Sequence, residues 1–508
     1  MATYADIVVA GGGHNSLITA CYLARAGYRC VVLDAGPVPG GGAATEELML
    51  PGFGIDTCAT GHPLIQLNPL LLRDELGLVS EYGLRYVEPD PVAHVVFPDG
   101  ESLTMWLDRQ RTAEQIARFS NADAAAYLRF LDDYERVAPE FARVRHTPGD
   151  TQPRLDRIWE RRAALSAWDV IRHEFGSRHV QAFMLWLAFQ DFEPPDTPGT
   201  GVSGYDVVYR RQRHSWPIPV GGSGRLIDAL TAFLEAHGGR VECDQEVADL
   251  ILDNGRCAGV ETSCGDRYLA TVAVVSSIHV KRLIDMVPRD TWPADFRYGI
   301  ATYDPGIAGL GVYLCTTEPP RFGDQAAVSA GLAGWPEDVL RLCADLRAGV
   351  YSPDVPWLLA ATPTLADPDR APEGMHTVKL LCPQAYDVPD KRAAGQRMLA
   401  AVRRQAPNLD GDVILDSLVY EPRDYERLNP HMVRGAFHGG DRGPAFSGAM
   451  RPAPGWAEHR MPVAGLYQTG GCTHPGGSIS GAPGRNAAIV LLADLGHDPE
   501  KILAPRAR

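Results

Sequence analysis

Residues 6–16 read DIVVAGGGHNS, and this stretch decides the fold. Its apolar first half is typical of a buried parallel strand, and its glycines are typical of a tight turn. A helix should follow, with apolar residues recurring on one of its faces at Leu17, Cys21 and Ala24. Gly27 supplies a stop, and a second apolar run at 30–33 ends at Asp34. The beginning of the chain therefore predicts one strand–helix–strand unit.

The glycine turn has the composition of a dinucleotide-binding turn, because glycines let backbone N–H groups approach a pyrophosphate at a helix N-terminus. Ser16 stands where the third glycine of the pattern G-x-G-x-x-G is usual. Asp34 offers a carboxylate to ribose hydroxyls and would repel a 2′-phosphate. The alternative is a structural glycine turn with a surface aspartate. The candidate cofactor-binding residues of this unit are Gly11, Gly12, Gly13, His14, Asn15, Ser16, Asp34 and Ala35.

A second glycine-rich loop, PGGGAAT at 39–45, follows directly. A nicotinamide dehydrogenase has no obvious need of it. Small residues here would let the chain pass close to the inner part of a long dinucleotide, which is the demand that FAD makes. A glycine-rich loop without a ligand is the alternative. We expect Gly41, Gly42 and Ala43 to contact the cofactor.

A third glycine-rich segment lies near the other end of the chain. It reads GLYQTGG at 465–471 and HPGGSISG at 474–481, and a helix should begin at about Arg485. A strand, a turn and a helix again present backbone donors and a helix dipole to an anionic or electron-rich group, here a flavin ring. The candidate contacts are Gly471, Gly477, Ser478 and Ile479. We predict that the turns near residues 12 and 475 converge on a single cofactor.

Taken together, these motifs resemble the superfamily of FAD-dependent phytoene desaturases and monoamine oxidases. The resemblance is greatest to its branch of phytoene dehydrogenase-like and pyridine nucleotide-disulfide oxidoreductase domain-containing protein 2-like proteins. The motifs that carry it are GGGHN at 11–15, GGGAAT at 40–45, PVGG at 219–222, QEV at 245–247, RPAPGW at 451–456, HPGG at 474–477 and GRNAA at 484–488. The resemblance implies that FAD is the cofactor, that the backbone of Val247 contacts its adenine side, and that the HPGG turn lies beside the isoalloxazine. The chain departs from the family at Ser16, at Asp34, where glutamate is commoner, and at Ser478-Ile479.

We expect an α/β protein, α+β overall, with a Rossmann-type FAD-binding domain built from discontinuous segments. Residues 1–102, 217–290 and 431–508 are assigned to this domain. Residues 103–216, mainly helical, and 291–430 are assigned to a substrate-binding domain with a mixed β-sheet and helices. Within the second range, strands are expected at 309–315, 357–361 and 376–381, and a helix at 392–404.

Composition sets limits on partners and location. The chain has 508 residues and a formal charge of −15, which opposes attraction to nucleic acid and to anionic lipid surfaces. Its 10 cysteines show no metal-ligand spacing, so no metal is expected, and they suit a reducing compartment. The N-terminus lacks a signal peptide pattern, and no apolar run approaches the roughly 18 residues of a membrane span. The cytoplasm is the expected location.

The sequence alone says less about the reaction than about the cofactor. The resemblance implies that the protein removes a hydride from a substrate carbon, desaturating a C–C bond of a hydrophobic or polycyclic small molecule. His474 and His62 are the candidate catalytic residues, each weighed against a structural imidazole, and His438 is a further candidate. The apolar run at 183–189 is the candidate wall of a substrate pocket, unless it is a core helix.

Three other functions remain open at this stage. They are amine (C–N) oxidation, a redox-neutral flavin isomerase, and a non-catalytic binding protein like the Rab GDP-dissociation inhibitors, which share this fold. The sequence also leaves open the substrate, the electron acceptor, a covalent flavin link through Cys472, the oligomeric state and peripheral contact with membranes.

Overall fold

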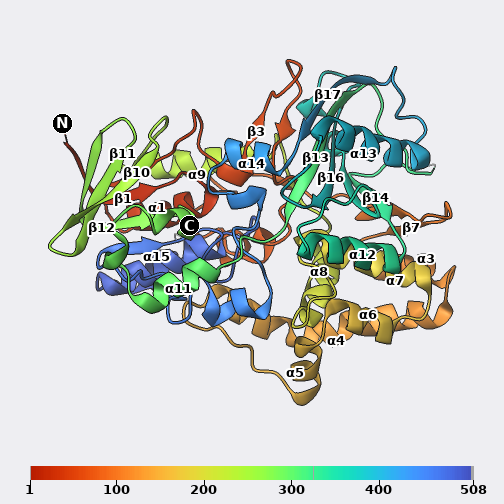
Figure 1. Ribbon diagram of the computed structural model, residues 1–508, viewed down its shortest axis with the longest axis horizontal. Coiled ribbons are helices and arrows are strands. Elements are labelled where there is room, and N and C mark those ends of the chain that lie inside the picture. The colour runs from red at the N-terminus through yellow and green to blue at the C-terminus, as the bar shows by residue number, and fades with distance from the viewer. Residues whose placement is uncertain (1, 324, 505–508) are drawn as a thin grey trace.

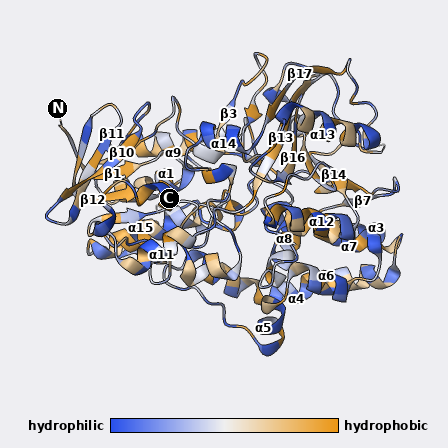
Figure 2. Ribbon diagram, in the orientation of Figure 1, coloured by the Kyte–Doolittle hydropathy of each residue, from blue (hydrophilic) through white to orange (hydrophobic). Residues whose placement is uncertain are grey.

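The computed structural model describes residues 2–323 and 325–504, arranged around two large sheets (Figure 1). Strands β1, β10, β11 and β12 lie in one half of the molecule, and β13, β14, β16 and β17 lie in the other. Apolar residues run along the strands of both sheets (Figure 2), so each half has its own hydrophobic core. Within the described ranges, no helix combines the length and the apolar composition that crossing a bilayer requires.

The first sheet has seven strands in the order β10-β11-β12-β1-β2-β9, with β18 beside β12. Its parallel part consists of β1 (Ala2–Ala10), β2 (Cys30–Leu33), β9 (Arg240–Glu242), β12 (Arg267–Ser276) and β18 (Leu466–Gln468). The strands β10 (Val247–Asp253) and β11 (Arg256–Thr262) extend it in antiparallel fashion. Mixed pairing of this kind agrees with the α/β class predicted from the sequence.

The strand–helix–strand unit is confirmed. Strand β1 pairs in parallel with β2, and helix α1 (His14–Arg25) connects them. Gly11 has a φ of +99° at the end of β1, a conformation that only glycine adopts at little cost, and this lets the chain turn into the helix. Leu17 and Cys21 of α1 are fully buried against the sheet. The apolar periodicity of α1 is therefore the part of the sequence that fixes this unit.

The two ends of the chain meet on α1. Helix α15 (Ala482–Asp494) packs beside it, and the Thr19 hydroxyl of α1 donates a 2.8 Å hydrogen bond to the carbonyl of Gly484. A Cβ added at Gly484 would lie 2.4 Å from the carbonyl oxygen of Asn15, so only glycine allows this approach. The Rossmann-type unit is thus completed by the C-terminal segment.

The second sheet has the order β17-β13-β16-β15-β14-β6-β7. Its strands are β6 (Ala93–Val96), β7 (Ser102–Met105), β13 (Ala308–Thr316), β14 (Ser329–Ala333), β15 (Trp357–Ala361), β16 (His376–Gln384) and β17 (Ile414–Tyr420). The three strands expected between residues 309 and 381 are all present. Because β6 pairs with β14, the second sheet already begins at residue 93, ahead of the boundary predicted at 102.

Helices cover the second sheet. They are α3 (Arg109–Ala117), α4 (Asn121–His146), α5 (Arg157–Ala164), α6 (Ala167–Glu174), α7 (Arg178–Ala188), α8 (Gly201–His214), α12 (Pro336–Arg347) and α13 (Lys391–Gln405). The remaining elements are α2 (Pro69–Leu72), α9 (Gly224–Ala236), α10 (Val280–Leu283), α11 (Ala294–Thr302), α14 (Pro422–Leu428) and α16 (Pro499–Leu503), with the short strands β3 (Thr45–Glu46), β4 (Ile55–Asp56), β5 (Tyr86–Val87) and β8 (Ile218–Pro219).

The apolar run at 183–189 is a core segment and not a pocket wall. Its residues lie in α7 and the turn after it, and all of them are buried in the hydrophobic core of the helical region. The Trp186 indole donates to the carbonyl of Leu358 in β15, at 2.9 Å. A helix that is apolar on every side is normally surrounded by protein, and here it is enclosed between the sheet and its neighbouring helices.

Candidate functional site

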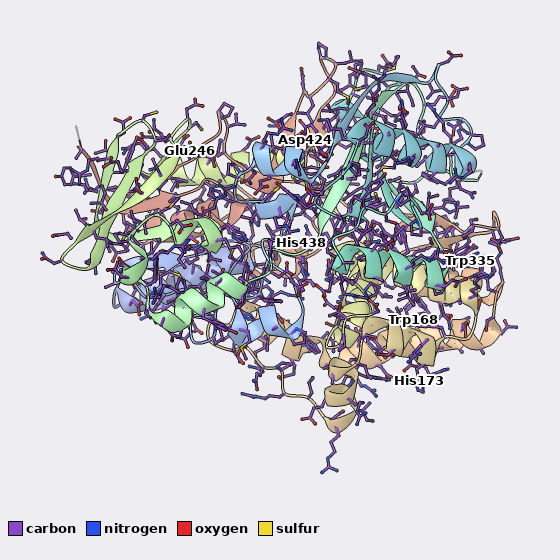
Figure 3. All side chains as sticks on the ribbon, in the orientation of Figure 1. Trp168, His173, Glu246, Trp335, Asp424 and His438 are labelled. Atoms are coloured by element: carbon purple, nitrogen blue, oxygen red, sulfur yellow. The ribbon has the colours of Figure 1, made fainter. Side chains whose placement is uncertain are left out.

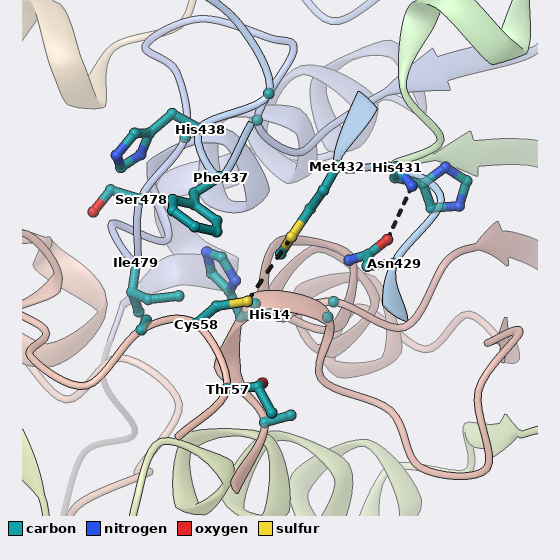
Figure 4. Close-up of a pocket in the computed structure, with 18 of the residues that line it drawn as sticks. His14, Thr57, Cys58, Asn429, His431, Met432, Phe437, His438, Ser478 and Ile479 are labelled. Carbon is teal, nitrogen blue, oxygen red and sulfur yellow. Dashed lines mark hydrogen bonds between the residues drawn. The ribbon is translucent and has the colours of Figure 1, made fainter. Parts of the chain in front are cut away.

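A cavity of about 370 Å³ lies between the two halves of the molecule. Its lining comes from both ends of the chain and from the second sheet with its helices, and Figure 4 shows the part contributed by residues 429–438 and 478–479. Of the candidate cofactor-binding residues, fourteen line it: Gly11, Gly12, Gly13, His14, Asn15, Ser16, Asp34, Ala35, Gly41, Gly42, Gly471, Gly477, Ser478 and Ile479. The three glycine-rich segments are therefore brought together at one place.

The start of α1 lies at one end of the cavity. In the described part of the chain no side chain caps this helix, so its first backbone amides are available to a ligand. The Ser16 hydroxyl is buried at the same place and has no hydrogen-bond partner among the described residues. A Cβ added at Gly13 would meet no atom within 4 Å, so the space beside this turn is open. These features fit the pyrophosphate of a dinucleotide.

Asp34 is fixed at the end of β2 by backbone donors. Its carboxylate accepts hydrogen bonds from the amides of Gly12 and Gly36, both at 2.8 Å. Burial raises the pKa of this carboxyl, and the hydrogen bonds from the two amides offset part of that increase. A Cβ at Gly12 would lie 2.7 Å from the Asp34 Oδ2 atom, so the glycine is required for the close approach. The carboxylate lines the cavity, where ribose hydroxyls could donate to it.

Two of the candidate cofactor contacts lie outside the cavity lining. Ala43 is fully buried in the core beside α9, although its neighbours Gly42 and Ala44 line the cavity. Val247 begins β10 and is also buried. Two residues before it, the backbone N–H of Gln245 donates to the carbonyl of Asp34, a residue that lines the cavity. The contacts of both residues with the cofactor remain predictions.

The C-terminal turn closes against a segment that precedes it. Ser478 has a left-handed φ of +75°, and a Cβ at Gly477 would lie 2.2 Å from the carbonyl oxygen of His438. Only a glycine at 477 lets these two chains pass so closely. The turn at 471–479 therefore presents its backbone, with the side chains of Ser478 and Ile479, to the cavity.

Neither histidine expected to be catalytic lines the cavity. His62 is fully buried, with Nδ1 3.0 Å from the Tyr86 hydroxyl and Nε2 2.9 Å from the Ser223 hydroxyl. His474 Nε2 donates to the carbonyl of Val144 at 2.9 Å. Both rings thus hold neighbouring segments together, and burial lowers the pKa of each. Their positions favour the structural interpretation considered above.

Of the histidines singled out from the sequence as catalytic candidates, His438 does line the cavity, and it lies at the end of segment 429–438. This segment carries His431, Met432, Phe437 and His438 into the cavity (Figure 4), and Figure 3 shows His438 between the two halves of the molecule. Burial and the nearby Arg442 lower the pKa of His438 to about 3, so its imidazole is neutral near pH 7. In the sequence, the glycine pair at 439–440 marks the turn beside His438. In the structure, a Cβ at Gly439 would lie 3.0 Å from the Gly471 backbone, so this turn passes close to the C-terminal one.

The second half of the molecule supplies apolar and charged side chains to the cavity. The apolar ones are Phe192, Val207, Trp216, Leu359, Leu381 and Phe437. The charged ones include Asp191, Arg210 and Arg211. Burial acts to raise the pKa of Asp191, but Arg442 and Arg210 lower it below its usual value overall. Asp191 is thus held as a carboxylate between two arginines, at 3.1 Å and 3.2 Å.

Comparisons with known proteins place this site in context. A family model described as "NAD(P)-binding Rossmann-like domain" matches residues 9–71. The chain is 27% identical to pyridine nucleotide-disulfide oxidoreductase domain-containing protein 2 of Rattus norvegicus, over 96% of this chain and 94% of the relative. It is 25% identical to a neurosporene-forming phytoene desaturase of Cereibacter sphaeroides, over 99% and 95% of the two chains. A solved structure of an engineered putrescine oxidase shares the fold, with a TM-score of 0.66 and 12% identity over 97% and 99% of the chains.

Proposed function

We propose that this chain, an oxidoreductase with a dinucleotide-binding Rossmann-type domain and relatives among the phytoene desaturases, uses FAD to dehydrogenate a C–C bond of a largely apolar small molecule. The observation that carries the proposal is the cavity itself. Glycine turns from both ends of the chain meet there with the apolar side chains of the second half.

The residues at the cavity suit the successive parts of FAD. Asp34 would accept hydrogen bonds from the ribose, and the amides at the start of α1, with the Ser16 hydroxyl, would bind the pyrophosphate. Gly41 and Gly42 would allow close passage of the inner part of the cofactor. The turn at 471–479 would then lie beside the flavin ring.

FAD would supply the acceptor for a hydride removed from one carbon while the neighbouring carbon releases a proton, and the protein supplies position and environment. Phe192, Leu359 and Phe437 form an apolar surface that would orient a substrate and exclude water from the reacting bond. The neutral imidazole of His438 offers one donor and one acceptor beside them, and so could hold a polar group of the substrate in place.

One aromatic contact in the cavity bears on the choice between C–C and C–N oxidation. The mark expected of an amine oxidase is a pair of facing aromatic rings at the flavin. Here Phe192 and Phe437 meet edge to face, with ring centroids 5.6 Å apart and an interplanar angle of 71°. This contact is edge to face and is not a facing pair, so C–C oxidation stays the first proposal.

Replacing Gly13 with alanine is expected to weaken FAD binding by at least about tenfold without destabilising the protein. Gly13 has an ordinary φ of −70° and its added Cβ meets no protein atom, so the methyl group would occupy only the space assigned to the cofactor. The measurement is a fluorescence titration of flavin-free protein with FAD, together with the thermal unfolding midpoint of each variant.

Gly411→Ala is the matched control, because a Cβ there also meets no atom within 4 Å but lies outside the cavity. It should bind FAD like the unaltered protein. Titration with NAD⁺ on the same samples tests the other dinucleotide. Protein that ignores FAD, or that binds NAD⁺ more tightly, would overturn the proposal.

A further inference from the structure

Arg211 is a buried cation on the cavity-facing side of α8. It is 1% exposed and lines the cavity together with Arg210, the residue before it, and with Val207, which lies one turn earlier on the same helix. Spacings of three and four residues put such side chains on one face. The guanidinium therefore faces the same space as the apolar side chains of the second half.

The two neighbouring arginines differ in how their charge is balanced. Arg210 is paired with Asp206 at 2.8 Å and with Asp191 at 3.2 Å. Arg211 Nη2 donates to the Ser329 hydroxyl at 2.7 Å, whereas its Nε and Nη1 are buried without a hydrogen-bond partner in the described chain. Among the described residues no carboxylate forms a salt bridge with Arg211. Burial, with the charge of Arg210 beside it, lowers the pKa of Arg211 to about 9, so it remains charged at pH 7.

The acidic groups of the cavity do not supply the missing counterion. Asp191 is already shared by Arg210 and Arg442. Asp34 belongs to the end of β2 and is held by backbone amides. Glu46, the third acidic residue of the lining, lies in β3 and forms no salt bridge with Arg211 in the described chain. What lies close to Arg211 is the Trp216 ring, 5.2 Å from the guanidinium carbon. A buried charge without a partner is costly, and chains keep one mainly where a ligand provides the opposite charge.

The structure assigns a carboxylate-bearing substrate to this site: we propose that Arg211 binds the carboxylate of an otherwise apolar substrate. This inference rests on the proposed function and narrows its substrate class to amphipathic acids. Guanidinium groups pair with carboxylates through short, charge-assisted hydrogen bonds. The same buried cation would repel an ammonium group, which adds a second reason against amine substrates.

The pyrophosphate of the cofactor is the other anion that could meet Arg211. The residues that contact Arg211 lie away from the start of α1, where the pyrophosphate is expected. Ser329 lies on β14 and Trp216 follows α8, and both belong to the half of the molecule that contains the second sheet. Figure 1 shows α8 below that sheet and α1 in the other half. The anion at Arg211 is thus supplied by the substrate, and the experiment separates the two sources.

The test is isothermal titration calorimetry of FAD-saturated protein with benzoate, benzamide and benzylamine as probes. Benzoate is expected to bind at least about tenfold more tightly than benzamide, and benzylamine not at all. Arg211→Gln should abolish the preference for benzoate, and Arg211→Lys should restore part of it. Arg213→Gln is the control, because Arg213 lies two residues further along α8 with its side chain 59% exposed.

Two readouts keep the outcomes distinct. FAD affinity, measured separately, should be the same for Arg211→Gln as for the unaltered protein; a loss there would assign Arg211 to the pyrophosphate instead. The unfolding midpoint of Arg211→Met should be unchanged or higher, because it removes an unbalanced buried charge, whereas a purely structural arginine would lower it. Equal binding of benzoate and benzamide, or no benzoate binding at millimolar concentration, would overturn the inference. If FAD fails to bind, the probes are titrated into the flavin-free protein, so the proposed function can fail alone.

Discussion

Replacing Glu75 with alanine is expected to lower the free energy of unfolding by about 3–5 kcal/mol, the usual cost of leaving one member of a buried ion pair alone. Glu75 is 2% exposed and binds the Arg485 guanidinium with both carboxylate oxygens, each at 2.9 Å. It also accepts a 2.6 Å hydrogen bond from the Tyr22 hydroxyl. The change would leave a buried cation without its partner.

The Glu75 carboxylate joins the two ends of the chain, because it binds Tyr22 of α1 and Arg485 of α15. The loss should therefore weaken FAD binding as well as the fold. Urea denaturation at pH 7.5 measures the change. Glu101→Ala is the matched control, since its pair with Arg118 is about half exposed and should contribute less than about 1 kcal/mol. Equal losses in the two variants would contradict this account of the junction.

The protein is also expected to lose stability steeply as the pH falls from about 6.5 to 4. Burial lowers the pKa of seven histidines to about 3 or 4; these are His14, His62, His146, His279, His431, His438 and His459. In the unfolded chain their pKa returns to about 6.5. Below that pH the unfolded state binds protons that the folded state does not bind. Each histidine therefore lowers the free energy of unfolding by about 1.4 kcal/mol at pH 5.5.

The direction of this effect follows from the depressed folded-state pKa values. The stability is fully present above about pH 6.5 and is lost as the pH falls towards the folded values. Urea denaturation at pH 7.5, 6.5 and 5.5 measures the slope. His62→Gln should reduce the slope, whereas a change at His173, which is exposed on an outer helix (Figure 3), should leave it unaltered. A free energy of unfolding that is constant between pH 7.5 and 5.5 would refute the interpretation.

The first sheet could be predicted because its signals are local. The apolar run at 6–10, the glycines after it and the helical spacing of Leu17 and Cys21 each specify the same unit. The boundary near 102 was harder to predict, because β6 and β7 are short and β14, the partner of β6, lies more than two hundred residues later in the chain. Pairing over such a separation leaves no mark in the local pattern.

The candidate site, too, could be predicted from the sequence only in part. The glycine turns could be found from composition, since backbone approach demands glycine wherever it occurs. Side chains that act at a distance could not. His62 and His474 stand beside turns in the sequence, yet their rings face other segments. Arg211 lies in the basic run RRQR at 210–213, which reads as a solvated helix surface until β14 and Trp216 are placed against it.

The two ends of the chain are expected to build one FAD site, and a crystal structure of the protein grown with FAD is the experiment that can show it. We expect density for a single cofactor, with its ribose at Asp34, its pyrophosphate at the start of α1 and its ring system beside the turn at 471–479. Density for FAD that touches only one of these segments, or a cavity that stays empty at saturating FAD, would contradict it.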